Sequence, residues 1–295
     1  MAKKPHIAIS DQPGVRLAQI EFTQELERRG FPAVWAPSRG DNVAFLLAIL
    51  DRTENINVGT GIANIYLRHP HLMGQAGSLI EELHPGRLML GIGVSHGPMH
   101  QALALTVGRP LEDTREYVRA MRSAAEGESF PRLVLAALRR RMTALAGEIA
   151  EGAIWANGIR SHMATSLNEV SLEGRDGFFV GNLIITAIED DRRAALTAAR
   201  RGLRRYFELP NYQRYFEEAG YHEEVAAARL ALSKGDYEAF EKAVTESFIA
   251  DSCLAGTASE VKEQAEAWEA EGVTLVLSPM AHDSSAMQAA LTAFE

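Results

Sequence analysis

Residues 88–100 read LMLGIGVSHGPMH, and this stretch guides the interpretation of the whole chain. Its apolar run, Leu88–Gly93, contains two glycines and ends shortly before Ser95 and His96. Unbroken apolar runs of this length are typical of parallel strands that are buried on both faces. Because glycine has no Cβ, another backbone or a flat ligand can approach such a strand closely. We interpret the stretch as a buried strand whose end presents a serine and a histidine.

Seven further apolar runs of similar length lie along the chain, separated by helical patterns. An alternation of eight strands with helices favours a closed (β/α)8 barrel, an α/β fold, over an open doubly wound sheet. Thr257 and Glu260 have the spacing of a capping box, which predicts a helix that runs from there to Glu271. The other seven predicted strands are residues 6–10, 33–36, 56–63, 133–137, 153–157, 182–188 and 274–278.

The connection between the seventh and eighth predicted strands is much longer than the others. We expect a single barrel domain, residues 1–295, with a helical insertion at about 203–250. Many of the chain's aromatic residues lie in or next to this insertion. They either pack an extra helical layer or a dimer interface, or form a wall over the mouth of the barrel.

The composition argues against several classes of partner. The 295-residue chain carries a formal net charge of −9 and no long run of Lys or Arg, so nucleic acids and acidic membrane surfaces are poor partners. Cys253 is the only cysteine, which excludes an intrachain disulfide and a cysteine-based metal cluster. No apolar segment has the pattern of a signal peptide or a membrane span. We therefore expect a cytoplasmic protein.

Three common interpretations of the opening stretch fail. A dinucleotide-binding fingerprint needs a third glycine where His96 stands, and it would close the first strand rather than the fourth. A metal site could begin from the pairs His69/His71 and His96/His100, but the other strand ends offer too few ligands, so we expect no metal. A nucleophilic serine at Ser95 lacks the Gly-x-Ser-x-Gly elbow.

Three motifs together resemble the luciferase-like flavin oxidoreductases, and most closely their coenzyme F420-dependent branch. The motifs are VGTGIAN with YLRHP (58–64 and 66–70), GRLMLGIGVSH (86–96), and AGT, EV and GVTL (255–257, 260–261 and 272–275). The resemblance implies a (β/α)8 barrel with a tricyclic ring at the carboxyl ends of the strands. It also implies that the third strand ends in a bulge with a cis peptide bond between Gly61 and Ile62.

The resemblance implies an F420-dependent oxidoreductase that transfers hydride between the deazaflavin C5 and a small organic substrate, as a homodimer. The protein would position the cofactor, which supplies the redox chemistry. An FMN-dependent luciferase-like monooxygenase is the alternative, and a non-catalytic flavin-binding homologue is the second alternative. Three departures from the family pattern leave the acid/base residue and the phosphate contacts open. Ser38 follows Trp35-Ala36-Pro37 where a glutamate or histidine is usual, and three arginines begin at Arg139. The first strand lacks the usual aromatic residue and ends in Ser10-Asp11-Gln12.

The predicted site residues follow the strand ends. His96 and His69 are the expected proton donors, because a neutral-range pKa suits general acid catalysis. The arginines at 139–141 suit the phosphate and acidic tail of F420, although they could equally form a solvated helix face. The expected cofactor-binding residues are Gly61, Ile62, Ala63, Asn64, Val94, Ser95, His96, Leu138, Arg139, Arg140, Asn157 and Gly158.

Overall fold

The computed structural model describes residues 3–170, 176–280 and 284–295. Contacts between Cα atoms divide the chain into two compact units. The N-terminal unit consists of Lys4–Trp155 and Leu167–Gly181. The C-terminal unit consists mainly of Ala156–Ser166 and Asn182–Glu295. The single domain expected over residues 1–295 stays a prediction.

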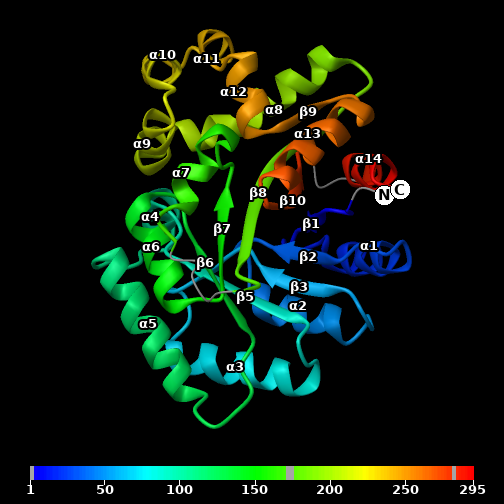
Figure 1. The fold of residues 1–295 in the computed structure, drawn as a ribbon, viewed down its shortest axis with the longest axis vertical. Helices are drawn as coiled ribbons and strands as arrows, with labels where there is room; N and C mark the ends of the chain where they lie inside the picture. The colour runs from blue at the N-terminus through cyan, green and yellow to red at the C-terminus, as the bar shows by residue number, and fades with distance from the viewer. Residues whose placement is uncertain (1–2, 171–175, 281–283) are drawn as a thin grey trace. The chain divides into compact units, whose positions relative to one another are not determined.

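The N-terminal unit alternates short parallel strands with helices (Figure 1). Its register places Trp35 opposite Gly59, and Gly91 opposite Val134. The strands are almost completely buried, as their unbroken apolar runs predict. The strands are β1 (His6–Ala8), β2 (Ala33–Ala36), β3 (Asn57–Thr60), β4 (Ala63–Asn64), β5 (Leu88–Gly93), β6 (Arg132–Ala136) and β7 (Gly152–Ala156). The helices are α1 (Arg16–Arg28), α2 (Asn42–Leu50), α3 (Pro70–Leu83), α4 (Gly97–Ala102), α5 (Pro110–Ala124) and α6 (Arg140–Ile149).

The C-terminal unit contains most of β8, the remaining strands and a run of helices between β8 and β10. The predicted capping box is present: Thr257 and Glu260 each accept a hydrogen bond from the other's backbone N–H at the start of α13. The strands are β8 (Phe179–Ile188), β9 (Leu254–Gly256) and β10 (Thr274–Pro279). The helices are η1 (Arg160–His162), α7 (Met163–Leu167), α8 (Arg192–Phe207), α9 (Pro210–Glu218), α10 (His222–Ser233), α11 (Tyr237–Ala243), α12 (Glu246–Ser252), α13 (Ala258–Ala270) and α14 (Ser284–Ala293).

The strand order confirms the predicted (β/α)8 barrel. It runs β10-β1-β2-β3-β5-β6-β7-β8-β9. Because β8 also pairs with β10, the sheet closes on itself. Two details differ from the prediction. The third apolar run is divided into β3 and β4, and β9 adds a three-residue strand along the end of β8. A run of three residues is too short to separate from a loop by its apolar pattern.

Gly91 and Gly93 are explained by the close approach of neighbouring strands. A Cβ at Gly91 would overlap the carbonyl oxygen of Thr60 at the end of β3, and Thr60 Oγ1 also donates a hydrogen bond to the Gly91 carbonyl at 2.6 Å. A Cβ at Gly93 would lie 2.7 Å from the Cβ of Ala136. The two glycines therefore let β5 pack tightly between its neighbours, which is the close approach of backbone expected from the sequence.

Three rings from distant parts of the sequence stack in the core of the N-terminal unit. The ring centroids of Trp35 and Phe179 lie 5.5 Å apart, and His6 stacks within 6.3 Å of both. Trp35 Nε1 donates a hydrogen bond to His6 Nδ1 at 2.9 Å, so the neutral imidazole carries its proton on Nε2. His6 thus has a packing role that its sequence context did not indicate.

The aromatic residues of the C-terminal helices form a packed core of their own. Phe207, Phe216 and Phe248 are completely buried, and their ring centroids lie 5.0–5.1 Å from one another. Tyr215 is also completely buried, 5.9 Å from the ring of Phe216. Aromatic pairs at these distances and tilts stabilise a core beyond the area that they bury. These four aromatic residues therefore pack the helical layer, which is the first of the two interpretations of the aromatic residues.

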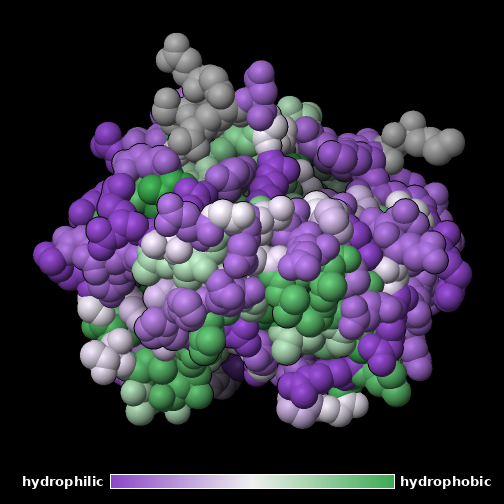
Figure 2. Space-filling view, turned by 90° about the horizontal axis from the view of Figure 1, so that it is seen from below, coloured by the Kyte–Doolittle hydropathy of each residue, from purple (hydrophilic) through white to green (hydrophobic). Residues whose placement is uncertain are grey.

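Apolar patches interrupt a mostly hydrophilic surface on the face shown in Figure 2. On α3, which packs against α5, Leu72, Leu79 and Leu83 remain about half exposed. Their spacing of seven and four residues places them on one face of the helix. Among the described residues, no helix combines the length and apolar character needed to cross a membrane.

Replacing Gly91 with alanine should destabilise the barrel strongly. The new Cβ would meet the Thr60 backbone rather than a movable side chain, and such overpacking costs about 3 kcal/mol. Gly97→Ala is the matched control, because no atom lies within 4 Å of a Cβ at that position. Chemical denaturation of the two variants measures the difference in the free energy of unfolding. Equal stability of the two variants would contradict the packing described for β3 and β5.

Candidate functional site

The end of β3 is the first element of the candidate site. The peptide bond between Gly61 and Ile62 is cis, as the resemblance predicted. The side chain of Asn42, at the start of α2, donates hydrogen bonds to the carbonyls of Ala36 (3.0 Å) and Ile62 (3.2 Å). Asn42 is buried and therefore ties the ends of β2 and β3 together. Sequence reasoning missed Asn42, because its partners are defined only by the fold.

The two residues of β4 hold this segment against the end of β5. Ala63 pairs with Ile92, and Asn64 pairs with Gly93. Asn64 Oδ1 accepts a hydrogen bond from the Tyr66 backbone N–H at 3.0 Å, which fixes the orientation of the amide. Its Nδ2 is buried and has no partner among the described residues. The amide therefore offers a buried donor beside the Gly61–Ile62 bond.

Val94, Ser95 and His96 lie half-buried at the end of β5. Ser95 has φ = +60°, a left-handed backbone that non-glycine residues rarely adopt and that often marks a functional site. His96 is the N-cap of α4, and its Nδ1 accepts a hydrogen bond from the Met99 backbone N–H at 3.3 Å. This contact places the proton of the neutral His96 ring on Nε2, the nitrogen that can act as a donor.

His69 also caps a helix, the one that follows β4. It is the N-cap of α3, and its Nδ1 accepts a hydrogen bond from the His71 backbone N–H at 3.2 Å. Both predicted proton donors therefore begin a helix. They differ in burial, because His69 is exposed whereas His96 is half-buried. Of the two, His96 has the environment expected of a residue beside a bound ring.

Asp11, just past the end of β1, is a further candidate that is not among the predicted site residues. It is completely buried. Its Oδ2 accepts a hydrogen bond from the Gly40 backbone N–H at 2.7 Å, whereas its Oδ1 has no partner in the described part of the chain. Burial raises the pKa of the Asp11 carboxyl above its ordinary value, against the opposing effect of the hydrogen bonds and of Arg16.

The end of β6 carries the predicted cofactor-tail residues. Leu138 and Arg139 are half-buried, and α6 begins directly after them. Arg140 is 80% exposed and forms an ion pair with Glu169 at 2.9 Å. An exposed ion pair of this kind contributes little stability and can exchange partners. Arg139 and Arg140 therefore differ in environment, although they were predicted to act together.

In the C-terminal unit, Asn157 and Gly158 follow the end of β7. Asn157 is completely buried, has φ = +51°, and accepts a hydrogen bond from the Ile185 backbone N–H on Oδ1 at 2.9 Å. The Gly158 backbone N–H donates to Asn182 Oδ1 at 3.0 Å. The Nδ2 atoms of Asn157 and Asn182 are both buried without a partner among the described residues. Asn182 begins a predicted strand, but nothing in the sequence indicated this contact.

Side chains of the C-terminal helices hold the loop that follows Gly158. Tyr215 accepts a hydrogen bond from the Ile159 backbone N–H at 2.9 Å, and burial raises the pKa of Tyr215 to about 12. Asp251 accepts two hydrogen bonds from Ser161, from the backbone N–H at 2.9 Å and from Oγ at 2.5 Å. Tyr221 donates a further bond to Asp251 at 2.9 Å. The insertion thus positions the β7 loop.

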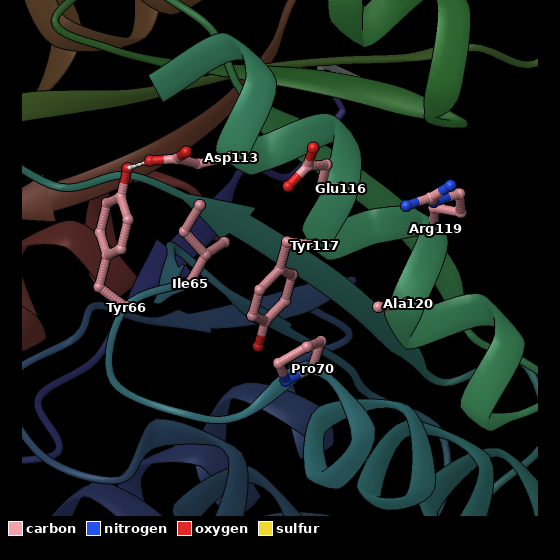
Figure 3. Close-up of a pocket in the computed structure, with 8 residues that line it drawn as sticks. All are labelled: Ile65, Tyr66, Pro70, Asp113, Glu116, Tyr117, Arg119 and Ala120. Carbon is pink, nitrogen blue, oxygen red and sulfur yellow. Dashed lines mark hydrogen bonds between the residues drawn. The ribbon is translucent and has the colours of Figure 1, made fainter. Parts of the chain in front are cut away.

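In the N-terminal unit, a cavity of about 390 Å³ lies between the segment after β4 and α5 (Figure 3). The hydroxyl of Tyr66 donates to Asp113 Oδ2 at 2.7 Å, and that of Tyr117 donates to the Arg68 carbonyl at 2.8 Å. The two tyrosine hydroxyls that line the cavity are therefore already hydrogen-bonded. The cavity lining includes none of the predicted site residues. This cavity is a weaker candidate than the strand ends.

Two of the unpaired atoms in the N-terminal unit have the hydrogen-bonding chemistry that a flavin-type ring requires. The pyrimidine edge of a flavin or deazaflavin alternates carbonyl acceptors with an N–H donor. Asn64 Nδ2 is a buried donor and Asp11 Oδ1 is a buried acceptor, and each lacks a partner among the described residues. Buried polar atoms without partners are costly, and a bound ring with such an edge would give both atoms a partner. Across the described residues, no group of three or more His, Cys, Asp or Glu side chains is arranged to hold a metal ion.

Comparisons with known proteins agree with this geometry. The chain is 26% identical to the 5,10-methylenetetrahydromethanopterin reductase of Archaeoglobus fulgidus over 309 aligned positions, covering 92% of both chains. Its fold is similar to the coenzyme F420-dependent tetrahydromethanopterin reductase of Methanopyrus kandleri, with a TM-score of 0.78, 18% identity and 100% of both chains covered. It is also similar to an F420-dependent secondary alcohol dehydrogenase, with a TM-score of 0.72, 18% identity and the same coverage.

The family is shown by a model that spans nearly the whole chain. The model for luciferase-like monooxygenases matches residues 6–275, from the first strand of the barrel to the last. The match includes the Gly61–Ile62 segment and the strand end at His96, on which the resemblance was based. The chain therefore belongs to the luciferase-like monooxygenase family of oxidoreductases.

Proposed function

We propose that this protein is a coenzyme F420-dependent oxidoreductase that transfers hydride between the deazaflavin C5 and a small organic substrate. The observation that carries the proposal is the set of buried, unpaired polar atoms at the strand ends of a luciferase-like barrel. The two F420-dependent enzymes of similar fold favour the deazaflavin over FMN. When bound, the cofactor supplies the hydride chemistry, and the protein supplies binding, orientation and proton transfer.

The residues at the ends of β3 to β5 would hold the ring. Gly61, Ile62 and Ala63 would contact its face, and Asn64 Nδ2 would donate to a ring carbonyl. Val94 and Ser95 would lie at its edge. These contacts use backbone and buried side chains that are already positioned, so little conformational entropy is lost on binding.

His96 is the proposed proton donor, with exposed His69 as the weaker candidate. The hydrogen bond from Met99 to His96 Nδ1 holds the ring in one orientation and keeps the proton on Nε2. An imidazole held in this way can give a proton to a reacting group and recover it from solvent.

Leu138, Arg139 and Arg140 of the N-terminal unit would bind the chain that extends from the ring, and Asn157 and Gly158 of the C-terminal unit stay predicted cofactor-binding residues. The phosphate and glutamates of F420 make this chain strongly anionic, and a protein of net charge −9 needs local positive groups to bind it. Guanidinium groups match phosphate and carboxylate oxygens in bidentate geometry. FMN ends at its phosphate and would gain less from the same arginines.

Titration of the purified protein with each cofactor tests this proposal. We expect F420 to bind more tightly than FMN, and its affinity to fall as salt is added, because salt screens the contacts to the anionic tail. Fluorescence or absorbance of the bound ring measures both affinities. Tight FMN binding without F420 binding would instead favour the FMN-dependent monooxygenase, and binding of neither would favour the non-catalytic homologue.

Substitution of the arginines tests the tail site separately. Arg139→Ala and Arg140→Ala should together weaken F420 binding at least tenfold, which corresponds to about 1.4 kcal/mol. Arg139 should account for the larger share, because it is half-buried whereas Arg140 is exposed and paired with Glu169. Arg122→Ala is the control, because Arg122 also forms an exposed ion pair but stands in the last turn of α5. An equal loss of affinity in the control would exclude a specific tail site.

The homodimer and the cytoplasmic location are retained as proposals. If a second copy covers the exposed leucines of α3, Leu79→Glu should shift the protein towards a monomer, because the interface would bury an unpaired charge. Leu230→Glu is the control, because Leu230 is similarly exposed but belongs to α10. Sedimentation equilibrium measures the mass of each variant. A monomeric parent protein would contradict the dimer, and an unchanged mass for Leu79→Glu would place its interface elsewhere.

A further inference from the structure

Asp11 combines three properties that a purely structural aspartate rarely has. It is completely buried just past the end of β1. One carboxyl oxygen, Oδ2, accepts the Gly40 backbone N–H at 2.7 Å. The other, Oδ1, is buried without a partner among the described residues. A buried carboxylate with only one oxygen hydrogen-bonded is unfavourable, because the other oxygen has lost its water without gaining a partner.

The charged groups around Asp11 do not supply the missing partner. Arg16 of α1 directs its Nε–H to the main-chain carbonyl of Asp11 at 2.7 Å. Arg39 interacts with the carboxyl through its backbone N–H, as Gly40 does. Asp41 caps α2 and pairs with Arg68 at 2.7 Å, so its own charge is compensated elsewhere. Oδ1 is thus an acceptor held in place by its surroundings, with no partner in the described ranges.

We propose that Asp11 Oδ1 recognises the bound cofactor by accepting a hydrogen bond from one of its N–H or O–H groups. This inference rests on the proposed function, because it takes the ligand to be a deazaflavin. F420 offers suitable donors: the N–H of its pyrimidine edge, its phenolic hydroxyl and the hydroxyls of its ribityl chain. The Gly40 N–H holds the carboxyl in one orientation, so Oδ1 is positioned before the ligand arrives.

The thermal stability of the ligand-free protein should show that Asp11 serves binding rather than folding. The folded-state pKa of Asp11 is raised above its unfolded value, so the carboxyl favours folding only at acid pH, and this contribution is lost as the pH rises through the folded-state pKa. At neutral pH, Asp11→Asn should therefore unfold at the same temperature as the parent or at a higher one. A residue kept for structure alone would instead lose stability on substitution.

The variant Asp11→Asn tests whether the cofactor group that faces Oδ1 is a hydrogen-bond donor. The asparagine oxygen stays on the Gly40 N–H, so the new NH2 group takes the place of Oδ1 and faces the donor of the cofactor. Two opposed donors should weaken F420 binding about 10- to 100-fold at pH 8, as expected for the loss of a charge-assisted hydrogen bond. The ratio of variant to parent affinity should approach one at acid pH, where the parent carboxyl is protonated. Asp11→Ala, which removes the acceptor without adding a donor, should lie between the two.

Asp41→Asn is the matched control, because it removes the same charge from the neighbouring loop and asparagine caps helices as well as aspartate. Its affinity for F420 should stay within twofold of the parent. Fluorescence titration measures the dissociation constants, and thermal unfolding checks that each variant is folded. F420 binding by Asp11→Asn that equals or exceeds the parent would overturn the inference while leaving the proposed function intact. Failure of the parent protein to bind F420 would overturn both.

Discussion

The close contact between Thr60 and Gly91 is the constraint on which the candidate site depends. Because Gly91 has no Cβ, the carbonyl of Thr60 lies directly against β5, and the Thr60 hydroxyl returns a hydrogen bond to the Gly91 carbonyl. β3 therefore ends at a fixed distance from β5, and β4 resumes the pairing with Ala63 and Asn64. The segment 61–64 and the strand end at His96 are brought together by this contact.

The strand ends share a second physical feature, which concerns how their backbone groups are satisfied. Buried backbone N–H groups need acceptors, and here asparagine side chains supply several of them. Asn64, Asn157 and Asn182 each use Oδ1 to accept a backbone N–H. An amide has donors as well as an acceptor, so each contact leaves a buried NH2 group without a partner among the described residues. The same side chains can therefore hold a loop in place and present a donor to a ligand.

The two histidines are positioned in a similar way, by a hydrogen bond between one side-chain atom and the backbone. His69 and His96 each begin a helix and accept a backbone N–H with Nδ1. A cap of this kind fixes the ring without a buried carboxylate, and it specifies which nitrogen carries the proton when the ring is neutral. Asp11 is held in a comparable way, through one oxygen to Gly40. In all three residues, one polar atom of the side chain serves the fold by accepting a backbone N–H.

The sequence by itself determined the barrel, most of its strands, the capping box at Thr257 and the position of the Gly61–Ile62 bond. These features depend on local apolar runs and on short motifs, which periodicity and resemblance can detect. Tertiary structure alone decided the hydrogen-bond partners of Asn42, Asp11 and Asn182, the burial of Tyr215 and the pairing of Arg140 with Glu169. The reason is sequence separation: Asp11 and Gly40 are 29 residues apart, and Ser161 and Asp251 are 90 residues apart. A hydrogen bond between such residues exists only after the strands have assembled, so no local pattern encodes it.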